Sequence, residues 1–207
     1  MGHEPVWNVC LVAILGSGLL IRGAYLRAAH KRGGTAVTRE SRASRASQAG
    51  LYAAAFGLIL TYLARPELLA WAHLPLWPEL RWAGVVLGLT SLVLLVWVHR
   101  VLDSNCSLTL VLREEHTLVT HGPYARIRHP MYAVWYLLHL AVFLITANGL
   151  IGFVLVGLYT VPVSLRMGEE DRMLSERFGQ AHVDYRMRTG RLLPRLRRTK
   201  PGNPDPG

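Results

Sequence analysis

Long uncharged stretches alternate with polar segments along most of the 207-residue chain. Five such stretches hold 16 to 19 residues each and cover Val6–Ile21, Gln48–Ala64, Trp82–Val98, Pro130–Asn148 and Gly149–Leu165. A helix rises about 1.5 Å per residue, so about 17 residues extend roughly 25 Å, close to a hydrocarbon core of about 30 Å. The pattern therefore predicts an all-α integral membrane protein with five transmembrane helices.

Turn-forming residues mark the connections between the predicted helices. Asn148 and Gly149 form a turn-favouring pair between the fourth and fifth stretches, which predicts a tight helical hairpin. Beyond the fifth stretch, a helical pattern stops at Gly179, and a second short helix is predicted to end near Gly190. The Ser- and Arg-rich segment 31–47 is predicted to be a mobile, lipid-facing loop.

Basic residues gather on one side of the predicted membrane. Charged residues make up only 17% of the chain, below the roughly 25% of soluble domains. In such an apolar chain, the net charge of +10 is better explained by contact with anionic lipid and by membrane topology than by binding of nucleic acid. Residues 22–47 carry seven Lys or Arg, residues 99–129 carry four, the chain from residue 166 onward carries ten, and residues 65–81 carry two. Because cytoplasmic segments are rich in Lys and Arg, the N-terminus is predicted outside and the C-terminus in the cytosol.

The chain is predicted to form a single membrane domain over residues 1–207. Within it, residues 6–98 hold three N-terminal spans, and residues 99–195 form a catalytic region that includes spans four and five. Residues 196–207 are predicted to be a flexible basic tail that contacts lipid head groups. A cleaved signal peptide is not expected, because the positive charge follows the first apolar stretch instead of preceding it.

A polar cluster stands directly before the fourth apolar stretch. Arg126, Arg128 and His129 precede Pro130, and the proline predicts a break at His129 that frees backbone groups. From this break, steps of three or four residues place polar aromatic side chains on one helix face, as a pocket wall requires. These side chains are His129, Tyr132, Tyr136 and His139. The alternative is that the cluster only marks the cytosolic end of a span.

A second polar cluster follows the fifth apolar stretch. Arg166 and Glu170 lie four residues apart and face the same way on a helix, and Glu169 and Asp171 extend the acidic group. Acidic residues at the cytosolic end of a span have no topological use, which favours a functional role. The alternative is a solvated helix end with an exposed ion pair. No metal site is expected, because the histidines lack ligand spacing with acidic or Cys partners.

Taken in order, the motifs of residues 100–195 resemble the isoprenylcysteine carboxyl methyltransferase family of integral membrane enzymes. The resemblance is carried by His116-Thr117-Leu118-Val119, Tyr124, the His129-Pro130-Met131-Tyr132 block, Arg166 and Glu170. It implies binding of S-adenosylmethionine by His116, Thr117, Leu118, Val119, Tyr124, His129, Pro130, Met131, Tyr132 and Glu170. It also implies that Arg166 meets the substrate. Thr109 departs from the family pattern, where an amide-bearing ligand often stands, and His121 is a candidate for the pocket rim.

The residue types fit the chemistry that the resemblance implies. Glu170 can accept hydrogen bonds from the cofactor, His129 and freed backbone amides can bind its carboxylate, and a Tyr ring can face its sulfonium. A carboxylate acceptor is already ionised at neutral pH and needs no general base. It does need a cation, and the guanidinium of Arg166 is always charged and can bind both carboxylate oxygens.

The sequence therefore predicts an S-adenosylmethionine-dependent O-methyltransferase that acts on the carboxylate of a lipophilic, prenyl-cysteine-like substrate. Its cytosolic cofactor pocket is predicted to be built from the loop before the fourth span and the C-terminal helices. Its membrane would be the inner membrane in a prokaryote and the endoplasmic reticulum in a eukaryote. One alternative is an N- or S-methyltransferase for a phospholipid amine or a small thiol. Others are a NADPH-dependent enzyme like the sterol reductases and a membrane protein without enzymatic activity. The acceptor atom and the oligomeric state are left open.

Overall fold

The structure, a computed structural model, describes residues 5–32, 36–38, 41–102, 111–113 and 117–195. Its main helices are α1 (Pro5–Arg32), α2 (Arg42–Ala64), α3 (Pro78–Leu102), α4 (Pro130–Thr146), α5 (Gly149–Gly152), α6 (Thr160–Phe178) and α7 (Gln180–Arg188). Shorter helical elements are η1 (Pro66–Ala72), η3 (Gly122–Ala125) and the π-helical η4 (Phe153–Leu158). The expected all-α architecture is confirmed, with one small addition. Two three-residue strands, β1 (Ala36–Thr38) and β2 (Val111–Arg113), pair antiparallel.

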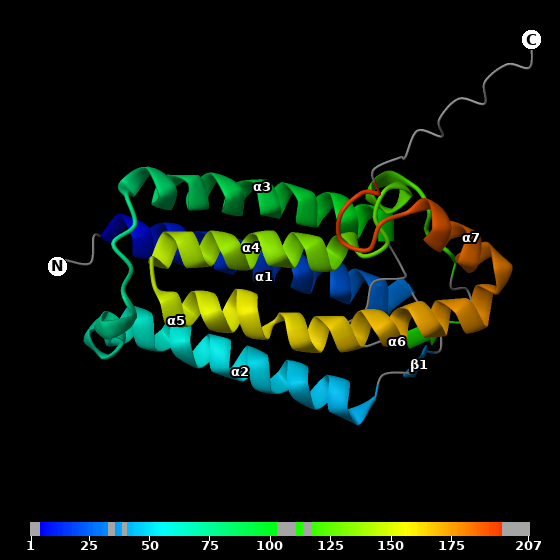
Figure 1. Cartoon of the computed structure of the whole chain (residues 1–207), viewed down its shortest axis with the longest axis horizontal. Helices are drawn as coiled ribbons and strands as arrows, with labels where there is room; N and C mark the ends of the chain where they lie inside the picture. The colour runs from blue at the N-terminus through cyan, green and yellow to red at the C-terminus, as the bar shows by residue number, and fades with distance from the viewer. Residues whose placement is uncertain (1–4, 33–35, 39–40, 103–110, 114–116, 196–207) are drawn as a thin grey trace, which may run out of the picture.

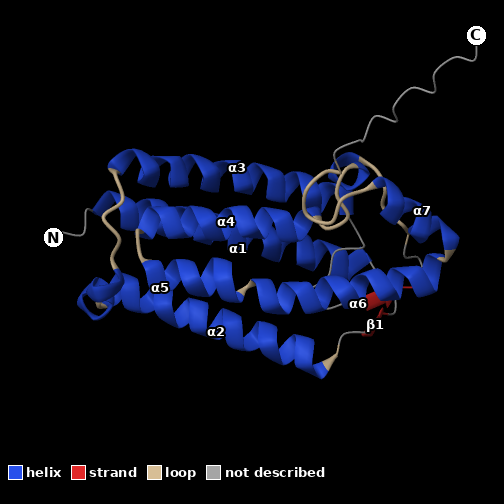
Figure 2. Ribbon diagram, viewed as in Figure 1, coloured by secondary structure: helices blue, strands red, loops and turns tan. Residues whose placement is uncertain are grey.

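The long helices lie side by side along the long axis of the molecule (Figure 1). The C-terminal end of α1, the N-terminal end of α4, and α7 meet at one end, which we name the polar end (Figure 2). The opposite end, named here the far end, holds η1 and the turn between α4 and α5 (Figure 1). Each long helix thus crosses the full length of the bundle, and successive helices run in opposite directions.

Four helices are long and apolar enough to cross a membrane, which indicates an integral membrane protein. They span Pro5–Lys31, Arg42–Ala64, Pro78–Leu102 and Gly149–Phe178. The remaining expected span, α4, is apolar but only 17 residues long, two fewer than the uncharged stretch Pro130–Asn148 from which it was predicted. It is shorter because Ala147 adopts a left-handed conformation, with φ of 47°, and ends the helix.

Two boundaries differ from the sequence prediction. Helix α2 begins at Arg42, inside the segment 31–47 that was expected to be a loop, because the Ser41 hydroxyl caps it by accepting a bond from the Ser44 amide at 3.1 Å. Helix α6 runs without interruption through the expected boundary at Leu165 and ends before Gly179, as predicted. The end of the apolar span and the acidic cluster therefore belong to the same helix. The predicted tail at residues 196–207 lies outside the described residues.

The tight turn expected at Asn148-Gly149 is present at the far end. Asn148 caps α5 by accepting a hydrogen bond from the Ile151 amide at 3.1 Å, and its side-chain amide donates to the Leu69 carbonyl at 3.0 Å. The Leu74 amide donates to the Ala147 carbonyl at 2.7 Å. One asparagine thus joins the turn to the connection between α2 and α3.

Helix α4 packs closely against α3 and forms the centre of the bundle. A methyl group at Gly84 would lie only 2.7 Å from Leu144 Cβ, and one at Gly88 would lie 2.8 Å from Ile14 Cδ1. The two glycines therefore allow α1, α3 and α4 to approach closely, as small residues do between membrane helices. Leu138 and Ile145 of α4 lie fully buried in the resulting core.

Candidate functional site

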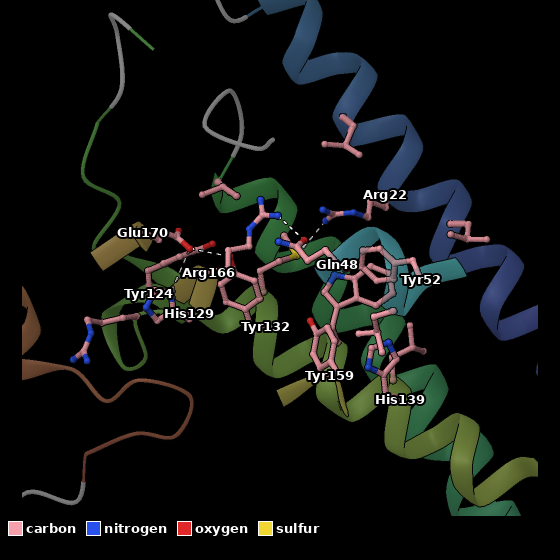
Figure 3. A pocket seen from close by; sticks show the side chains of 18 of the residues that line it. Arg22, Gln48, Tyr52, Tyr124, His129, Tyr132, His139, Tyr159, Arg166 and Glu170 are labelled. Atoms are coloured by element: carbon pink, nitrogen blue, oxygen red, sulfur yellow. Dashed lines mark hydrogen bonds and ion pairs between the residues drawn. The ribbon is translucent and has the colours of Figure 1, made fainter. Parts of the chain in front are cut away.

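A cavity of about 610 Å³ extends from the polar end into the middle of the bundle. We name it the central cavity. Its polar part is lined by residues such as Glu170 of α6 and Tyr185 of α7, and its apolar part reaches Leu15, Ile59 and Leu155 (Figure 3). Helices from both halves of the sequence therefore build a single chamber that is polar at one end and apolar at the other.

The central cavity brings together nine of the residues predicted to form the site. Those that line it are Thr117, Leu118, Val119, Tyr124, His129, Met131, Tyr132, Arg166 and Glu170. Pro130 is buried at the first position of α4 and does not line the cavity. His121 is exposed before η3 and does not line the cavity either. His116 and Thr109 lie outside the described residues.

The break before α4 is stabilised by the segment that follows α7. The Arg128 amide donates to the Gly190 carbonyl at 2.8 Å, and the His129 amide donates to the Arg191 carbonyl at 3.1 Å. The Gly190 amide donates back to the Arg126 carbonyl at 3.1 Å. The expectation that freed amides at the break bind a carboxylate is therefore wrong for Arg128 and His129. Their N–H groups are already used because a buried backbone donor must find a partner.

His129 lies between two carboxylates. Its Nε2 is 3.2 Å from Asp171 Oδ1, and its Nδ1 is 3.5 Å from Glu170 Oε2. Tyr132 donates its hydroxyl to the same Glu170 oxygen at 3.0 Å. Burial alone would lower the pKa of His129, but the two carboxylates outweigh it and raise the pKa to about 9. The imidazole is therefore a buried cation at neutral pH that fixes the position of Glu170.

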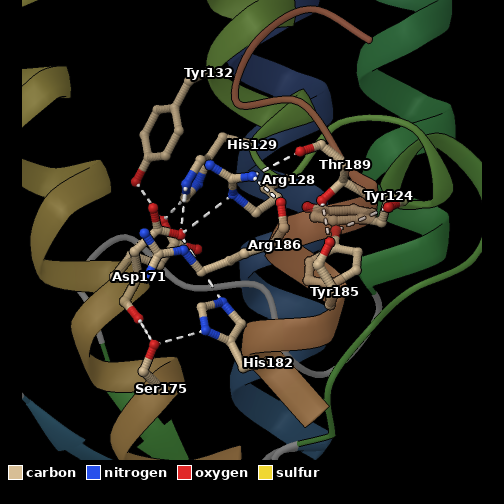
Figure 4. A network of polar contacts seen from close by, with 11 residues as sticks. Tyr124, Arg128, His129, Tyr132, Asp171, Ser175, His182, Tyr185, Arg186 and Thr189 are labelled. Carbon is tan, nitrogen blue, oxygen red and sulfur yellow. Dashed lines mark hydrogen bonds and ion pairs between the residues drawn. The ribbon is translucent and has the colours of Figure 1, made fainter. Parts of the chain in front are cut away.

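A polar network beneath His129 attaches α7 to the rest of the site (Figure 4). Arg128 donates from Nη1 to the Thr189 carbonyl at 2.7 Å, and its Nε lies 3.8 Å from Asp171 Oδ1. Tyr185 donates its hydroxyl to the Tyr124 carbonyl at 2.8 Å. The sequence predicted that the C-terminal helices help to build the pocket, but it assigned no residue of α7 to the site. The network shows that α7 holds the short helix and the break that carry Tyr124 and His129.

His182 of α7 is the other buried imidazole in this network. It lies 2.8 Å from Ser175 Oγ through Nδ1 and 3.9 Å from Asp171 Oδ1 through Nε2. Burial is the main reason that the pKa of His182 is lowered, and nearby arginines add to the effect. Two histidines therefore face Asp171 with pKa values shifted in opposite directions, and only His129 carries a charge at neutral pH.

Arg166 faces the cavity from the middle of α6. Its side chain is 8% exposed, and its Nη1 donates to Gln48 Oε1 of α2 at 2.7 Å. Arg22 of α1 enters from another side, with Nη1 3.9 Å from Met131 Sδ and its guanidinium 5.6 Å from the Trp135 ring centre. The sequence prediction included neither Gln48 nor Arg22. Arg22 is the first charged residue after an apolar stretch, so it looked like a residue that only sets the membrane topology.

The aromatic wall predicted on α4 is only partly correct. His129, Tyr132 and His139 line the central cavity, but Tyr136 does not. The Tyr136 hydroxyl instead donates to Thr160 Oγ1 at 3.0 Å. Tyr159, which follows η4, packs edge-on against His139 with ring centres 4.5 Å apart and supplies the missing aromatic ring. The turn of π-helix before Tyr159 alters the helical register, which sequence periodicity does not reveal.

The apolar part of the cavity reaches the outer surface between α1 and α2. Leu19 of α1 and Phe56 of α2 line the cavity and are also 66% and 65% exposed. Tyr52 lines it as well and is 50% exposed. In a membrane this surface faces lipid. A lipophilic molecule could therefore enter the cavity from the bilayer between these two helices.

The cavity carries an excess of positive charge. Its described lining holds Arg22, Arg128, Arg166 and the protonated His129, against the carboxylate of Glu170 and that of Asp171, which lies directly behind His129 and Arg128. Cations inside a membrane protein are costly unless an anion accompanies them. The cavity is therefore suited to a ligand that brings negative charge. The described residues contain no group of three or more His, Cys, Asp or Glu that could hold a metal ion.

Comparison with known proteins confirms the resemblance expected from the motifs. Residues 84–176 match the model of the isoprenylcysteine carboxyl methyltransferase family. The protein-S-isoprenylcysteine O-methyltransferase of Tribolium castaneum is 34% identical over 84 residues, which cover 39% of this chain and 28% of that protein. The enzyme of the same name from Rattus norvegicus is 33% identical over 93 residues, which cover 43% of this chain and 31% of that protein. The matched part thus spans less than a third of either relative.

The fold also resembles that of a solved structure. The structure of a eukaryotic intramembrane Ras methyltransferase, an isoprenylcysteine carboxyl methyltransferase, superposes with a TM-score of 0.57. The similarity covers 89% of this chain and 67% of that one at 22% sequence identity. At this identity the similarity establishes a shared fold. Because it covers 89% of the chain, the similarity extends well beyond residues 84–176 that the family model matches.

Proposed function

We propose that this protein transfers a methyl group from S-adenosylmethionine to the carboxylate of a lipophilic, prenyl-cysteine-like acceptor at the membrane. The observation that carries the proposal is the central cavity, in which one chamber joins a cation-rich polar part to an apolar part that reaches the lipid-facing surface. The relatives are named for the same reaction. A water-soluble acceptor would have no use for the apolar part.

The proposal includes five membrane crossings, with the N-terminus outside and the polar end in the cytosol. The placement of basic residues supports this orientation. Only Arg65 and Arg81 lie in residues 65–81 at the far end, whereas the other 21 of the 23 Lys and Arg residues lie in the segments 22–47, 99–129 and 166–200. Helix α4 would be the fifth crossing. Its 17 residues rise about 26 Å, and it lies within the bundle beside α3, so α3 and the other helices shield its ends.

The residues of the polar part fit S-adenosylmethionine. Glu170 is held in place by His129 and Tyr132 and would accept hydrogen bonds from an amino or hydroxyl group. The side chains of Tyr124 and Tyr132 offer aromatic rings for a cation. The bound cofactor would supply a methyl group on a sulfonium, and an ionised carboxylate oxygen would accept that methyl group while the S–C electron pair stays on sulfur. This transfer needs no proton to be removed.

Arg166 would bind the acceptor carboxylate. It is held by Gln48 at the point where the polar part of the cavity meets the apolar part. A guanidinium can bind both oxygens of a carboxylate in one plane, which fixes the direction of attack. The apolar residues of α1 and α2 would hold the prenyl chain and exclude water. Rate would then come mainly from alignment of the reacting atoms.

Two measurements on the purified full-length protein test this function. Calorimetric titration with S-adenosylhomocysteine should show binding, and the protein should methylate N-acetyl farnesyl-cysteine. Glu170→Gln keeps an acceptor for Tyr132 but removes the charge, so it should weaken S-adenosylhomocysteine binding about 10- to 150-fold. The exposed Glu176→Gln on the same helix is the matched control and should change nothing. Normal binding by Glu170→Gln would remove the cofactor assignment.

The alternatives predict different results. The positive charge of the cavity favours an anionic acceptor over an amine. If the protein methylates a thiol or an amine but not farnesyl-cysteine, the carboxylate is not the acceptor. A reductase or a protein without enzymatic activity predicts no binding of S-adenosylhomocysteine at all.

A further inference from the structure

Arg22 is an unusual residue for its position in the fold. It lies ten residues before the end of α1 at Arg32, which is about 15 Å along the helix axis. Arg27 and Lys31 on the same helix are exposed, whereas Arg22 is partly buried and lines the central cavity. A cation that only fixes topology would extend toward the head groups at the helix end. Arg22 instead contacts Met131 and Trp135 of α4, on the inside of the bundle.

The contacts of Arg22 leave its charge uncompensated. Its nearest polar contact is a weak one with a thioether, and its other contact is with an indole ring. Among the residues that the structure describes, none gives Arg22 a carboxylate partner. A guanidinium in a membrane helix is costly, and such residues mark sites where a ligand or substrate passes.

Arg22 and Arg166 approach the same part of the cavity from different helices. Figure 3 shows the side chains of Arg22, Gln48 and Arg166 extending toward one another from α1, α2 and α6. Gln48 accepts a hydrogen bond from Arg166 at 2.7 Å and so fixes the direction of that guanidinium. Two cations that point toward one space repel each other when it is empty, and an anion placed between them relieves the repulsion.

We propose that Arg22 is a second anion-binding residue of the acceptor site, so that the acceptor carboxylate binds between the guanidinium groups of Arg22 and Arg166. Gln48 is then a positioning residue for Arg166. This inference rests on the proposed function and makes it more specific, because two cations select an ionised carboxylate over a neutral group of the same shape. It also gives α1 and α2, which the family match leaves out, a direct part in acceptor recognition.

The test compares two ligands that differ only in charge. Farnesyl-cysteine with a free carboxylate and its carboxamide are titrated into the detergent-solubilised protein loaded with S-adenosylhomocysteine. The ratio of their dissociation constants measures how strongly the site selects the charge. Arg22→Gln should lower this ratio about tenfold, and Arg22→Lys should lower it less, because an ammonium keeps the charge but not the planar fork. Arg27→Gln removes the same charge from the exposed side of α1 and should leave the ratio unchanged.

Several outcomes would overturn the assignment of Arg22. One is a ratio in Arg22→Gln equal to that of the wild type. Another is loss of S-adenosylhomocysteine binding in both Arg22 variants, which would make Arg22 a structural residue. A third is an equal fall of the ratio in Arg27→Gln, which would show that the effect comes from the general surface charge.

Failure of the proposed function would give a different result. In that case the wild-type protein would methylate no farnesyl-cysteine, yet the Arg22-dependent preference for the carboxylate would persist. The anion-binding assignment would then stand without the reaction.

Discussion

The two ends of the bundle use buried polar groups in different ways. At the far end, Arg81 donates from Nε and Nη2 to the Ile145 carbonyl at 3.0 and 2.8 Å and lies 4.2 Å from the Trp7 ring centre. Asn148 likewise bonds to backbone groups through both ends of its amide. In the cavity that extends from the polar end, Arg22 and Glu170 face open space. Arg81 and Asn148 at the far end hold helices together, whereas Arg22 and Glu170 retain binding capacity for a ligand.

This contrast has an energetic basis. A buried polar group that bonds to backbone repays its desolvation within the protein. Arg22 faces the cavity with no carboxylate partner among the described residues, so it lowers stability in the free protein and raises affinity for an anionic ligand. Substitutions at the two ends should therefore separate stability from activity. Three predictions follow this separation, from the largest expected effect to the smallest.

Arg166→Ala should abolish most methyl transfer while S-adenosylhomocysteine affinity stays nearly unchanged. Truncating one partner of a desolvated charge pair costs about 2–5 kcal/mol, or at least roughly 30-fold in rate. Arg166→Lys should recover only part of the rate, because an ammonium cannot bind both carboxylate oxygens in one plane. Turnover of N-acetyl farnesyl-cysteine and cofactor titration are measured on the same preparations. Near wild-type turnover in Arg166→Ala would contradict the carboxylate-binding role.

The polar end should lose stability as pH rises, because of His129. Its pKa is raised from 6.5 in the unfolded chain to about 9 in the folded protein. The stabilising contribution is therefore complete below about pH 6.5 and is lost as pH rises through about 9, a difference on the order of 3 kcal/mol. Thermal unfolding of the wild type and of His129→Gln is compared between pH 6 and 9.5. The difference between the two should shrink as pH increases, and a constant or growing difference would contradict the prediction.

Asn148→Ala at the far end should lower stability without changing the chemistry of folded molecules. The substitution removes two hydrogen bonds, one to the Leu69 carbonyl and one from the Ile151 amide, worth together about 1–3 kcal/mol. Thermal unfolding should report the loss, and turnover per mole of folded protein should equal that of the wild type. The half-buried Thr61 on α2 donates its hydroxyl only to a carbonyl of its own helix, so Thr61→Ala is a control with little expected effect. A fall in turnover with unchanged stability would contradict the division between the two ends.

The far end could be predicted well because its determinants are local. The Asn148-Gly149 pair predicted the turn between α4 and α5, and the uncharged stretches predicted the helices that meet there. The length of α4 was overestimated because apolar residues continue past Thr146, where the backbone already turns at Ala147. Composition identifies which residues tolerate lipid, but the last hydrogen bond of a helix depends on backbone geometry.

The candidate site was predicted as a set of residues and not as an arrangement. The motifs placed Tyr124, His129 and Glu170 in one group, and the central cavity contains all three. No sequence pattern indicates that His129 lies between two carboxylates or that its amide donates to the Arg191 carbonyl. The side chains of Tyr132 and Tyr136 looked equivalent on a helical wheel, yet only Tyr132 lines the cavity.

By itself, the sequence determined that this is an integral membrane protein and where its helices approximately lie, and both follow from composition, short-range periodicity and local turn chemistry. The residues of the family motif were instead identified by their resemblance to isoprenylcysteine carboxyl methyltransferases. Only the tertiary structure decided that Gln48 binds Arg166, which lies 118 residues further along the chain, and that Arg22 faces the same space. Such contacts join helices whose sequences are independent of one another. These contacts depend on which apolar faces of the helices pack together, and that packing is a property of the whole bundle.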